Sequence, residues 1–349
     1  IFITIFVSVL VTTAFYGLLN TKGVYAYSGL GDGSADNPYR INTCGQLQEM
    51  SSNLTAVYHL DNDVDCSVTV SWNGGYGFVP VGDLLNPFQG TLDGNGHSIS
   101  GLTIDRPTTD YVGLFGNVSL PGLIQDIRFD NVSISGQQYV GGVAGNNSAS
   151  IFEIGITGEV SGTASVGGIV GRNVYFINHV HSNVTISGVP GSGAGGGLAG
   201  ENGGFILNSY STGIVPNGLR KGGVIGYDYD SGGSADTFWD TQTSGINVSA
   251  GDAVGKTTAE LKDFTTFFAD DGVWSIDPLI NQGYPYLTSQ YPVAETSTNT
   301  SIETKTNTNP AAASLASTGS DTEAFFTSAL TLIGAGTLMM AYFINRKLN

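Results

Sequence analysis

Residues 142–171 read GVAGNNSASIFEIGITGEVSGTASVGGIVG and span one period of a repeat that begins and ends with a G-x-x-G motif. Five copies of this motif lie between positions 110 and 230. They are Gly113–Gly116, Gly142–Gly145, Gly168–Gly171, Gly197–Gly200 and Gly223–Gly226, so successive closing glycines are 29, 26, 29 and 26 residues apart. A regular period of this length indicates a repeat architecture in which each copy forms one structural unit.

A second series of motifs shows where the longer repeats carry their extra residues. Ser135-Gly136, Ser161-Gly162 and Ser187-Gly188 are each 26 residues apart, although the G-x-x-G series contains two steps of 29. One three-residue insertion therefore lies between positions 116 and 136, and the other lies between 188 and 200. Loops that absorb insertions while strands keep their phase are typical of one coil per repeat.

Composition and local pattern favour strands over helices. Glycine supplies 51 of the 349 residues, which disfavours helices, and the Gly-X-Y period of collagen is absent. Ile151–Ile156 and Val180–Ile186 show the partial apolar alternation of short strands. Coils whose strands pair in parallel with the next coil form a parallel β-helix, and parallel crossovers are almost always right-handed. We therefore predict an all-β protein whose body is a right-handed parallel β-helix (solenoid).

An asparagine stands two residues after the closing glycine in three of the repeats. These asparagines are Asn147, Asn173 and Asn202, and Asp228 takes the same place in the last repeat. Asparagine tolerates the left-handed turn conformation, and stacked amide side chains can hydrogen-bond from coil to coil. We predict a structural asparagine ladder, and a role in ligand binding is the alternative.

Two segments beside the repeats carry signals for helix starts. Thr43 with Gln46, and Thr257 with Glu260, have the spacing of a capping box before a short apolar run. The ends of a β-helix expose sheet edges that need cover. We therefore assign residues 27–60 to an N-terminal cap, 61–248 to the β-helix and 249–291 to a C-terminal cap, with short capping helices.

The N-terminus has the pattern of a secretory signal peptide. Residues 1–20 carry no charge, and Val24-Tyr25-Ala26 gives an A-x-A-like cleavage site. We predict a signal peptide over residues 1–26 with cleavage between Ala26 and Tyr27, which puts the mature chain outside the cell. An N-terminal membrane anchor is the alternative, because about 20 apolar residues can span a bilayer.

The C-terminus combines three features in a fixed order. Residues 292–314 form a Thr/Ser/Asn-rich spacer, residues 315–319 read LASTG, and residues 324–344 form an uncharged run ahead of a basic tail. That run is long enough for a transmembrane helix, so residues 315–349 form one C-terminal unit. The arrangement resembles the cell-wall sorting signal of Gram-positive-type bacteria, whose usual pentapeptide is L-P-x-T-G.

This resemblance implies processing by a sortase and a covalent link to peptidoglycan. The matching residues are Leu315, Ala316, Ser317, Thr318 and Gly319. A sortase of that family would cut between Thr318 and Gly319. Ala316 replaces the usual proline and looks like the L-A-x-T-G variant, which leaves the sortase class open. A plain membrane anchor is the alternative.

The repeats resemble the GLUG repeat family of bacterial surface proteins over nearly all of residues 31–290. Besides the G-x-x-G units, the shared motifs are PFQGTLDGNGH at 87–97, YVGLFG at 111–116, FWDTQTSG at 238–245 and WSIDP at 274–278. The resemblance implies a β-helix stalk of adhesin-like surface proteins, and of IgA-specific metallopeptidases in which the repeat is not the catalytic part. No H-E-x-x-H motif surrounds the four histidines, so the peptidase activity is not carried over.

Cys44 and Cys66 are the two cysteines of the chain. In an exported protein they predict a disulfide, which would close a loop of about 22 residues and stabilise the fold by about 3 kcal/mol in the chain-entropy model. Two free buried thiols are the alternative.

The sequence argues against several cofactors and partners. A net charge of −17 excludes a nucleic-acid partner. The one G-x-G-x-x-G match falls in an insertion between strands, where no helix follows to bind a phosphate. Asp61, Asp63 and Asp65 begin a calcium-loop pattern but lack the glycine and glutamate that complete it. His179 and His181 have no evident third metal ligand. We predict no metal and no cofactor.

These observations favour a wall-anchored surface protein that displays a binding face. We expect adhesion to host or neighbouring cells through an unknown extracellular glycan or protein ligand, without catalysis. The alternative is an extracellular polysaccharide lyase or glycoside hydrolase of β-helix type, which needs paired carboxylates or a basic residue at matching coil positions. The acidic residues show no obvious paired set, and Arg128 and Arg172 differ in coil position. We therefore name no catalytic residues.

Overall fold

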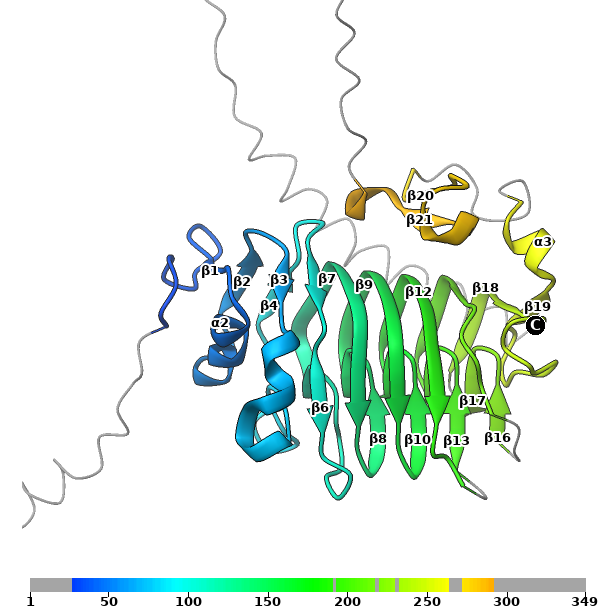
Figure 1. The fold of residues 1–349 in the computed structure, drawn as a ribbon, viewed down its shortest axis with the longest axis horizontal. Helices are drawn as coiled ribbons and strands as arrows, with labels where there is room; N and C mark the ends of the chain where they lie inside the picture. The colour runs from blue at the N-terminus through cyan, green and yellow to red at the C-terminus, as the bar shows by residue number, and fades with distance from the viewer. Residues whose placement is uncertain (1–26, 191–192, 217–219, 230–231, 264–271, 292–349) are drawn as a thin grey trace, which may run out of the picture. The chain divides into compact units, whose positions relative to one another are not determined.

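The computed structural model describes residues 27–263 and 272–291, apart from the short stretches 191–192, 217–219 and 230–231. The predicted signal peptide (1–26), spacer (292–314) and sorting unit (315–349) lie outside the described residues. The described chain folds as an all-β solenoid of about five turns, with few helices (Figure 1). No helix in this part is long and apolar enough to cross a membrane.

Most strands belong to one large sheet that winds along the solenoid. Its main path runs through β1 (Tyr39–Ile41), β2 (Val57–Leu60), β4 (Thr91–Asp93), β7 (Phe115–Ser135), β9 (Ala144–Ser161), β12 (Phe176–Ser187), β15 (Phe205–Ser211), β18 (Gly233–Asp240) and β19 (Val254–Lys256). Six further strands pair onto this path: β3 (Val64–Asp65), β5 (Ser98–Ser100), β6 (Thr103–Asp105), β11 (Val170–Asn173), β14 (Ala199–Asn202) and β17 (Ile225–Asp228). The pairing is parallel, so the sequence-based prediction of stacked parallel coils is confirmed.

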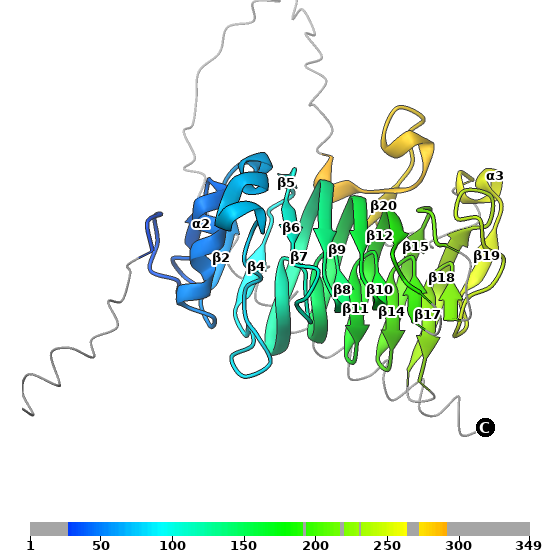
Figure 2. The same ribbon diagram turned by 60° about the horizontal axis from the view of Figure 1, so that its bottom comes forward.

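A second sheet of four parallel strands runs beside the first (Figure 2). Its strands are β8 (Gln138–Gly141), β10 (Ala164–Gly167), β13 (Ala194–Gly196) and β16 (Arg220–Gly222). Each G-x-x-G motif of the central coils joins a strand of this sheet to the large sheet: β8 ends at Gly141, and β9 begins at Ala144. The two sheets therefore meet along an edge built by the repeated motif.

Steric contact at this edge explains the repeated glycines. A Cβ atom added at Gly142 would lie 2.5 Å from the carbonyl oxygen of Gly168 in the next coil. A Cβ atom at the closing Gly145 would lie 2.5 Å from the carbonyl carbon of Tyr111 in the preceding coil. Non-bonded atoms cannot approach so closely, so only glycine lets the backbones pack at this spacing.

The insertions lie in the two intervals that the repeat spacing predicts. In the pairing of β7 with β9, the register shifts by two residues between Ser119 and Leu123 and by one residue between Phe129 and Val132. The first insertion is therefore divided between two bulges. The second lies in the loop between β12 and β13, because Ser161 pairs with Ser187 while Val166 pairs with Gly195.

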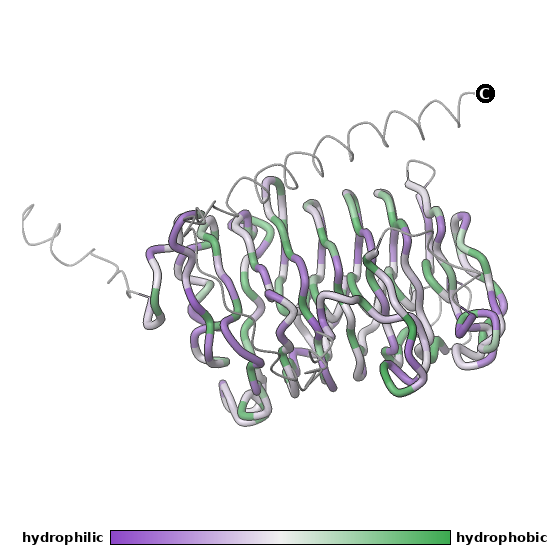
Figure 3. The backbone as a smooth tube through the Cα atoms, turned by 90° about the horizontal axis from the view of Figure 1, so that it is seen from above, coloured by the Kyte–Doolittle hydropathy of each residue, from purple (hydrophilic) through white to green (hydrophobic). Residues whose placement is uncertain are grey.

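The core is a stack of apolar side chains inside the coils. Ile124, Ile151, Ile177 and Ile206 follow one another in register from β7 to β15, and all four are fully buried. Hydrophobic and hydrophilic stretches alternate along the coils (Figure 3). Each coil therefore adds an apolar layer to a continuous core, which is the main source of stability in such folds.

The predicted N-terminal cap contains strands as well as a helix. β1 and β2 already belong to the large sheet, and between them lie α2 (Cys44–Glu49) and the 3-10 turn η1 (Met50–Ser52). The Thr43 hydroxyl accepts a hydrogen bond from the Gln46 backbone at the start of α2. The solenoid therefore begins within residues 27–60, earlier than the boundary assigned from sequence.

The predicted C-terminal cap divides into two parts. β19 extends the large sheet, and α3 (Thr258–Leu261) is a single turn whose start has the capping box of Thr257 and Glu260. Residues 272–291, which we call the C-terminal strap, form the second part. They form β20 (Trp274–Ser275), η4 (Asn281–Gly283), β21 (Tyr286–Leu287) and η5 (Thr288–Gln290). The strap lies along the side of the solenoid (Figure 1). It contacts β18 through Tyr284, β12 and β15 through Trp274, and β7 and β9 through Gln290.

Candidate functional site

The asparagines of the predicted ladder form a chain of side-chain hydrogen bonds inside the solenoid. Asn147 Nδ2 donates to Asn173 Oδ1 at 2.9 Å, Asn173 Nδ2 donates to Asn202 Oδ1 at 2.8 Å, and Asn202 Nδ2 donates to Asp228 Oδ1 at 2.7 Å. The three asparagines have no exposed surface. They are therefore sealed from any ligand, and their contacts serve the fold.

Cys44 and Cys66 form a disulfide in the structure. Cys44 is the first residue of α2, and Cys66 follows β3, so the bond ties the first helix to the sheet. Both residues are buried. Free cysteines are absent from the described part of the chain.

The three aspartates of the calcium-like motif have separate partners. Asp61 forms an ion pair with Arg40 at 2.9 Å, while Asp63 accepts a hydrogen bond from the Ser98 backbone at 2.8 Å. Asp65 caps its own turn by accepting from a backbone N–H at 2.9 Å. In residues 27–263 and 272–291, gaps aside, no three His, Cys, Asp or Glu side chains are grouped so that they could hold a metal ion.

His179 and His181 differ in their surroundings. His179 has φ +52°, so the chain turns there, and His181 is buried with its ring stacked on Tyr210 at 5.4 Å. Burial lowers the pKa of His181 to about 4, and the charge of Arg128 acts in the same direction. His181 is therefore neutral at physiological pH and serves as an aromatic packing residue under Trp274 of the strap.

Two carboxylates occupy the same position in neighbouring coils, so the sequence-based statement that the acids form no paired set is wrong. Ile127 pairs with Ile154, which places Asp126 beside Glu153 at one corner of the solenoid. The two-part insertion in β7 hid this equivalence. Ser289 of the strap donates to Glu153 Oε2 at 3.0 Å. Burial raises the pKa of Asp126 more than the Ser289 hydroxyl lowers it.

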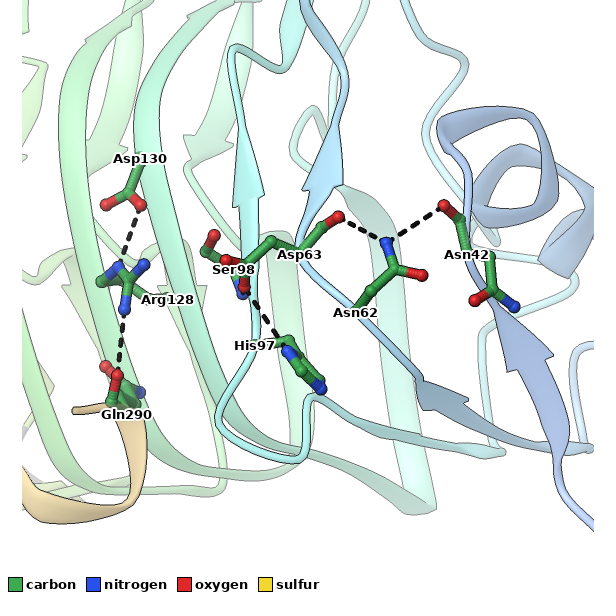
Figure 4. A network of polar contacts seen from close by, with 8 residues as sticks. All are labelled: Asn42, Asn62, Asp63, His97, Ser98, Arg128, Asp130 and Gln290. Atoms are coloured by element: carbon green, nitrogen blue, oxygen red, sulfur yellow. Dashed lines mark hydrogen bonds and ion pairs between the residues drawn. The ribbon is translucent and has the colours of Figure 1, made fainter. Parts of the chain in front are cut away.

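A polar network fixes the strap to the N-terminal coils beside this pair (Figure 4). Arg128 Nη1 donates to the Gln290 carbonyl at 3.0 Å, and its Nε donates to Asp130 at 2.9 Å. The guanidinium also lies 4.9 Å from the ring centre of Tyr291. The strap therefore occupies this side of the solenoid, and Arg128 already has its partners within the chain.

A second polar surface carries no such cover in the described structure. We call it the tyrosine–arginine face, and it consists of Tyr111, Tyr139, Arg172, Glu201 and Tyr229. Tyr111 and Tyr139 stand at equivalent corners of successive coils, since the following residues Val112 and Val140 form a parallel bridge. Their φ angles are +59° and +55°, and their rings stack at 4.9 Å with an interplanar angle of 14°.

The neighbouring strands β11 and β14 bring a basic and an acidic residue side by side at the same edge of the solenoid. Arg172 in β11 pairs in register with Glu201 in β14. Glu201 Oε1 accepts from Ser165 at 2.5 Å, and Oε2 accepts from Tyr229 at 2.8 Å. The Arg172 guanidinium lies 5.9 Å from the Tyr229 ring centre. Arg172 Nε is buried, and it has no hydrogen-bond partner among the residues that the structure describes.

The hydroxyl groups of Tyr139 and Tyr229 keep their protons at neutral pH. The hydrogen bond to Glu201 raises the pKa of Tyr229, and burial adds to the effect. Burial raises the pKa of Tyr139, and the nearby charge of Glu201 adds to it. The face therefore presents aromatic rings, hydroxyls, one guanidinium and the Glu201 carboxylate, and tyrosine and arginine are enriched at binding hot spots.

Sequence reasoning did not find the tyrosine–arginine face, although one signal was present. The tripeptide Tyr-Val-Gly occurs at 111–113, where its glycine opens a G-x-x-G motif, and again at 139–141, directly before the next motif. Arg172 was noted, but its relation to Tyr139 was not, because the two residues come from different positions of neighbouring coils.

Comparison with known proteins finds two relatives that this chain resembles over part of its length. No family model matches it. It is 40% identical over 159 residues to Halomucin from Haloquadratum walsbyi, a match that covers 44% of this chain and 2% of Halomucin. It is 32% identical over 178 residues to a Gly-rich membrane protein from Evansella cellulosilytica, covering 41% of this chain and 21% of that protein. The chain thus spans a small part of the relatives it matches.

Among solved structures, the chain resembles a candidate immunoglobulin A1 protease from Bacteroides ovatus. The TM-score is 0.56 at 21% sequence identity, and the match covers 74% of this chain and 94% of the other. At this identity the likeness shows the fold alone. Together, the names of the relatives and the shared fold are consistent with a surface-associated or membrane-associated β-helix protein.

Proposed function

We propose that this chain is a surface β-solenoid that binds an extracellular ligand, a glycan or a protein, through the tyrosine–arginine face and acts in adhesion without catalysis. The observation that carries the proposal is the juxtaposition of stacked Tyr111 and Tyr139 with Arg172, a half-buried side chain that takes part in none of the ion pairs of the described residues. A rigid solenoid holds these groups in place, which reduces the entropy that binding would cost.

The proposal includes export and attachment to the wall. In it, the signal peptide is removed after Ala26, a sortase reads Leu315–Gly319, and Thr318 becomes linked to peptidoglycan. The solenoid winds to the right, as expected for parallel crossovers. Changing Thr318 to Ala should move the protein from the wall fraction to the membrane or medium. Equal wall linkage of the variant would contradict the sorting signal.

Adhesion is tested by measuring how the purified protein binds to host or neighbouring cells. The double variant Tyr139→Ala/Arg172→Gln should bind about tenfold more weakly or worse, the range of interface hot spots. The matched control is Arg40→Gln, which removes the same charge from a distant exposed ion pair. If the double variant and the control bind like the unchanged protein, the tyrosine–arginine face is not the adhesive surface.

A second candidate function is a carbohydrate-active β-helix enzyme, which the adjacent Asp126 and Glu153 favour. Glycosidases use two carboxyl groups, one of them with a raised pKa. The assay is release of reducing sugar from wall and host polysaccharides, with Asp126→Asn and Glu153→Gln as paired variants. Release that both variants abolish would overturn the non-catalytic proposal.

A further inference from the structure

We propose that the ligand of the tyrosine–arginine face is a glycan with a carboxylated sugar, whose carboxylate pairs with Arg172 while its ring stacks on the tyrosines. This inference rests on the proposed function and names the ligand class of the same face. It follows from three properties: Arg172 has no ion-pair partner among the described residues, the tyrosine stack ends beside it, and the chain as a whole is acidic.

Arg172 is placed next to an acid that does not pair with it. Glu201 stands in register with Arg172 on the adjacent coil, yet the hydroxyls of Ser165 and Tyr229 occupy its two oxygens. The ion pairs found in the described residues involve other side chains. Arg172 is half-buried, so a ligand reaches the end of its side chain and not the buried Nε. A carboxylate can pair with the guanidinium there, because the guanidinium fork matches the two oxygens of a carboxylate.

The tyrosine stack ends beside Arg172. Tyr111 and Tyr139 stack on each other, but the next coil places Ser165 at the same corner, with φ +48°. The short side chain of Ser165 turns to Glu201. No ring therefore continues the stack past Tyr139. A pyranose ring has an apolar face of C–H groups that packs well on an aromatic ring, and its hydroxyl groups suit the phenol of Tyr229.

The charge of the whole chain restricts the kind of acidic glycan. With a net charge of −17, the protein repels a long polyanion such as a polyuronate. The face has one guanidinium, and the acidic Glu201 stands beside it, so the face fits a single carboxylate instead. The ligand that matches is an otherwise neutral glycan with one acidic sugar at the contact point.

The test compares acidic sugars with neutral analogues of the same shape. The probes are the methyl glycosides of glucuronic acid and of N-acetylneuraminic acid, each paired with its carboxamide, and binding to the full protein is measured by calorimetry. The unchanged protein should bind at least one acid about tenfold more tightly than its amide. Arg172→Gln should remove this preference, and Arg172→Lys should restore only part of it, because an ammonium lacks the fork geometry.

Variants at two other positions distinguish specific pairing with the carboxylate from two other effects, which are ring stacking and general attraction between charges. Tyr139→Ala should weaken the binding of the acidic sugar and of its carboxamide equally, whereas Tyr139→Phe should keep the preference for the acid. Arg40→Gln is the matched control, since Arg40 is paired with Asp61 at the N-terminal end of the solenoid, away from the face. It should change acid binding less than twofold. An effect as large as that of Arg172→Gln would mean simple attraction between charges and would overturn the proposal.

The remaining outcomes distinguish this inference from the proposed function. If neither acid binds, or if acids and amides bind equally, the carboxylated-sugar proposal is wrong. If the same protein still adheres to cells and Tyr139→Ala/Arg172→Gln still abolishes adhesion, the adhesive role of the face stands with another ligand. If the unchanged protein adheres to no cell, the proposed function fails independently of the sugar result.

Discussion

The asparagine ladder gives the most direct test of how the coils are held in register. Asn173 accepts from Asn147 at 2.9 Å and donates to Asn202 at 2.8 Å, with no exposed surface at any of the three residues. In Asn173→Ala, the oxygen of Asn202 loses its donor, while the amide of Asn147 keeps only a long contact of 3.5 Å to Phe176. Each unsatisfied buried group costs about 1–3 kcal/mol, so we expect a loss of about 3 kcal/mol.

The ladder also has a direction, which allows a sharper comparison. Every amide donates toward the later coil, and the last member is Asp228, a carboxylate that only accepts. Asn173→Asp can still accept from Asn147 but cannot donate when ionised, so it should destabilise more than the alanine variant. Asp228→Asn keeps the final acceptor and should cost little.

The assay is urea unfolding together with thermal unfolding of the purified variants. For a domain of this size, about 3 kcal/mol corresponds to a fall of roughly 6–12 °C in Tm. The reasoning is refuted if Asn173→Ala stays within about 1 kcal/mol of the unchanged protein. It is also refuted if Asp228→Asn destabilises as much as Asn173→Asp does.

Three further predictions concern the disulfide, the buried histidine and the glycine edge. Replacing Cys44 and Cys66 by Ala should lower the free energy of unfolding by about 3 kcal/mol in urea, and an unchanged midpoint would contradict this. The pKa of His181 is about 4 in the folded protein and near 6.5 in the unfolded chain. The free energy of unfolding should therefore be highest above pH 6.5 and should fall by about 3 kcal/mol as the pH drops toward 4. His181→Phe should flatten this dependence of the free energy of unfolding on pH. Gly171→Ala should cost about 1–3 kcal/mol, because its Cβ would lie under 3.0 Å from a backbone carbonyl carbon of the adjacent coil, whereas Gly45→Ala, with its nearest neighbour at 3.8 Å, should not destabilise.

The repeat spacing predicted the fold because it reflects a steric requirement of the backbone. Gly145 and Gly171 each lie against the corner of the preceding coil, so the glycine must return once per coil. The same argument placed Asn147 and Asn173 on adjacent coils, where their amides meet. Features that every coil repeats are readable from spacing alone, since the period fixes which residues lie side by side.

Contacts that do not repeat could not be predicted in this way. The strap is held by the burial of Trp274 and Leu287 against Tyr210. This tertiary contact occurs once, so it leaves no periodic pattern in the sequence. The path of the strap along the side of the solenoid could therefore not be predicted from the repeat. The pairing of Asp126 with Glu153 was hidden for a related reason, because the bulges in β7 changed the count of residues between equivalent positions.

The tyrosine–arginine face is linked physically to the feature that determines the fold. Gly171 packs against the backbone of Tyr139, and Arg172 is the next residue, so the close approach of the two backbones sets the position of the guanidinium relative to the rings. A larger residue at 171 should therefore weaken ligand binding as well as stability. The side chains at the corner itself are less constrained, since the series Tyr111, Tyr139 and Ser165 varies while the backbone stays left-handed. Recognition can thus change at the corner positions without changing the glycines that keep the coils stacked.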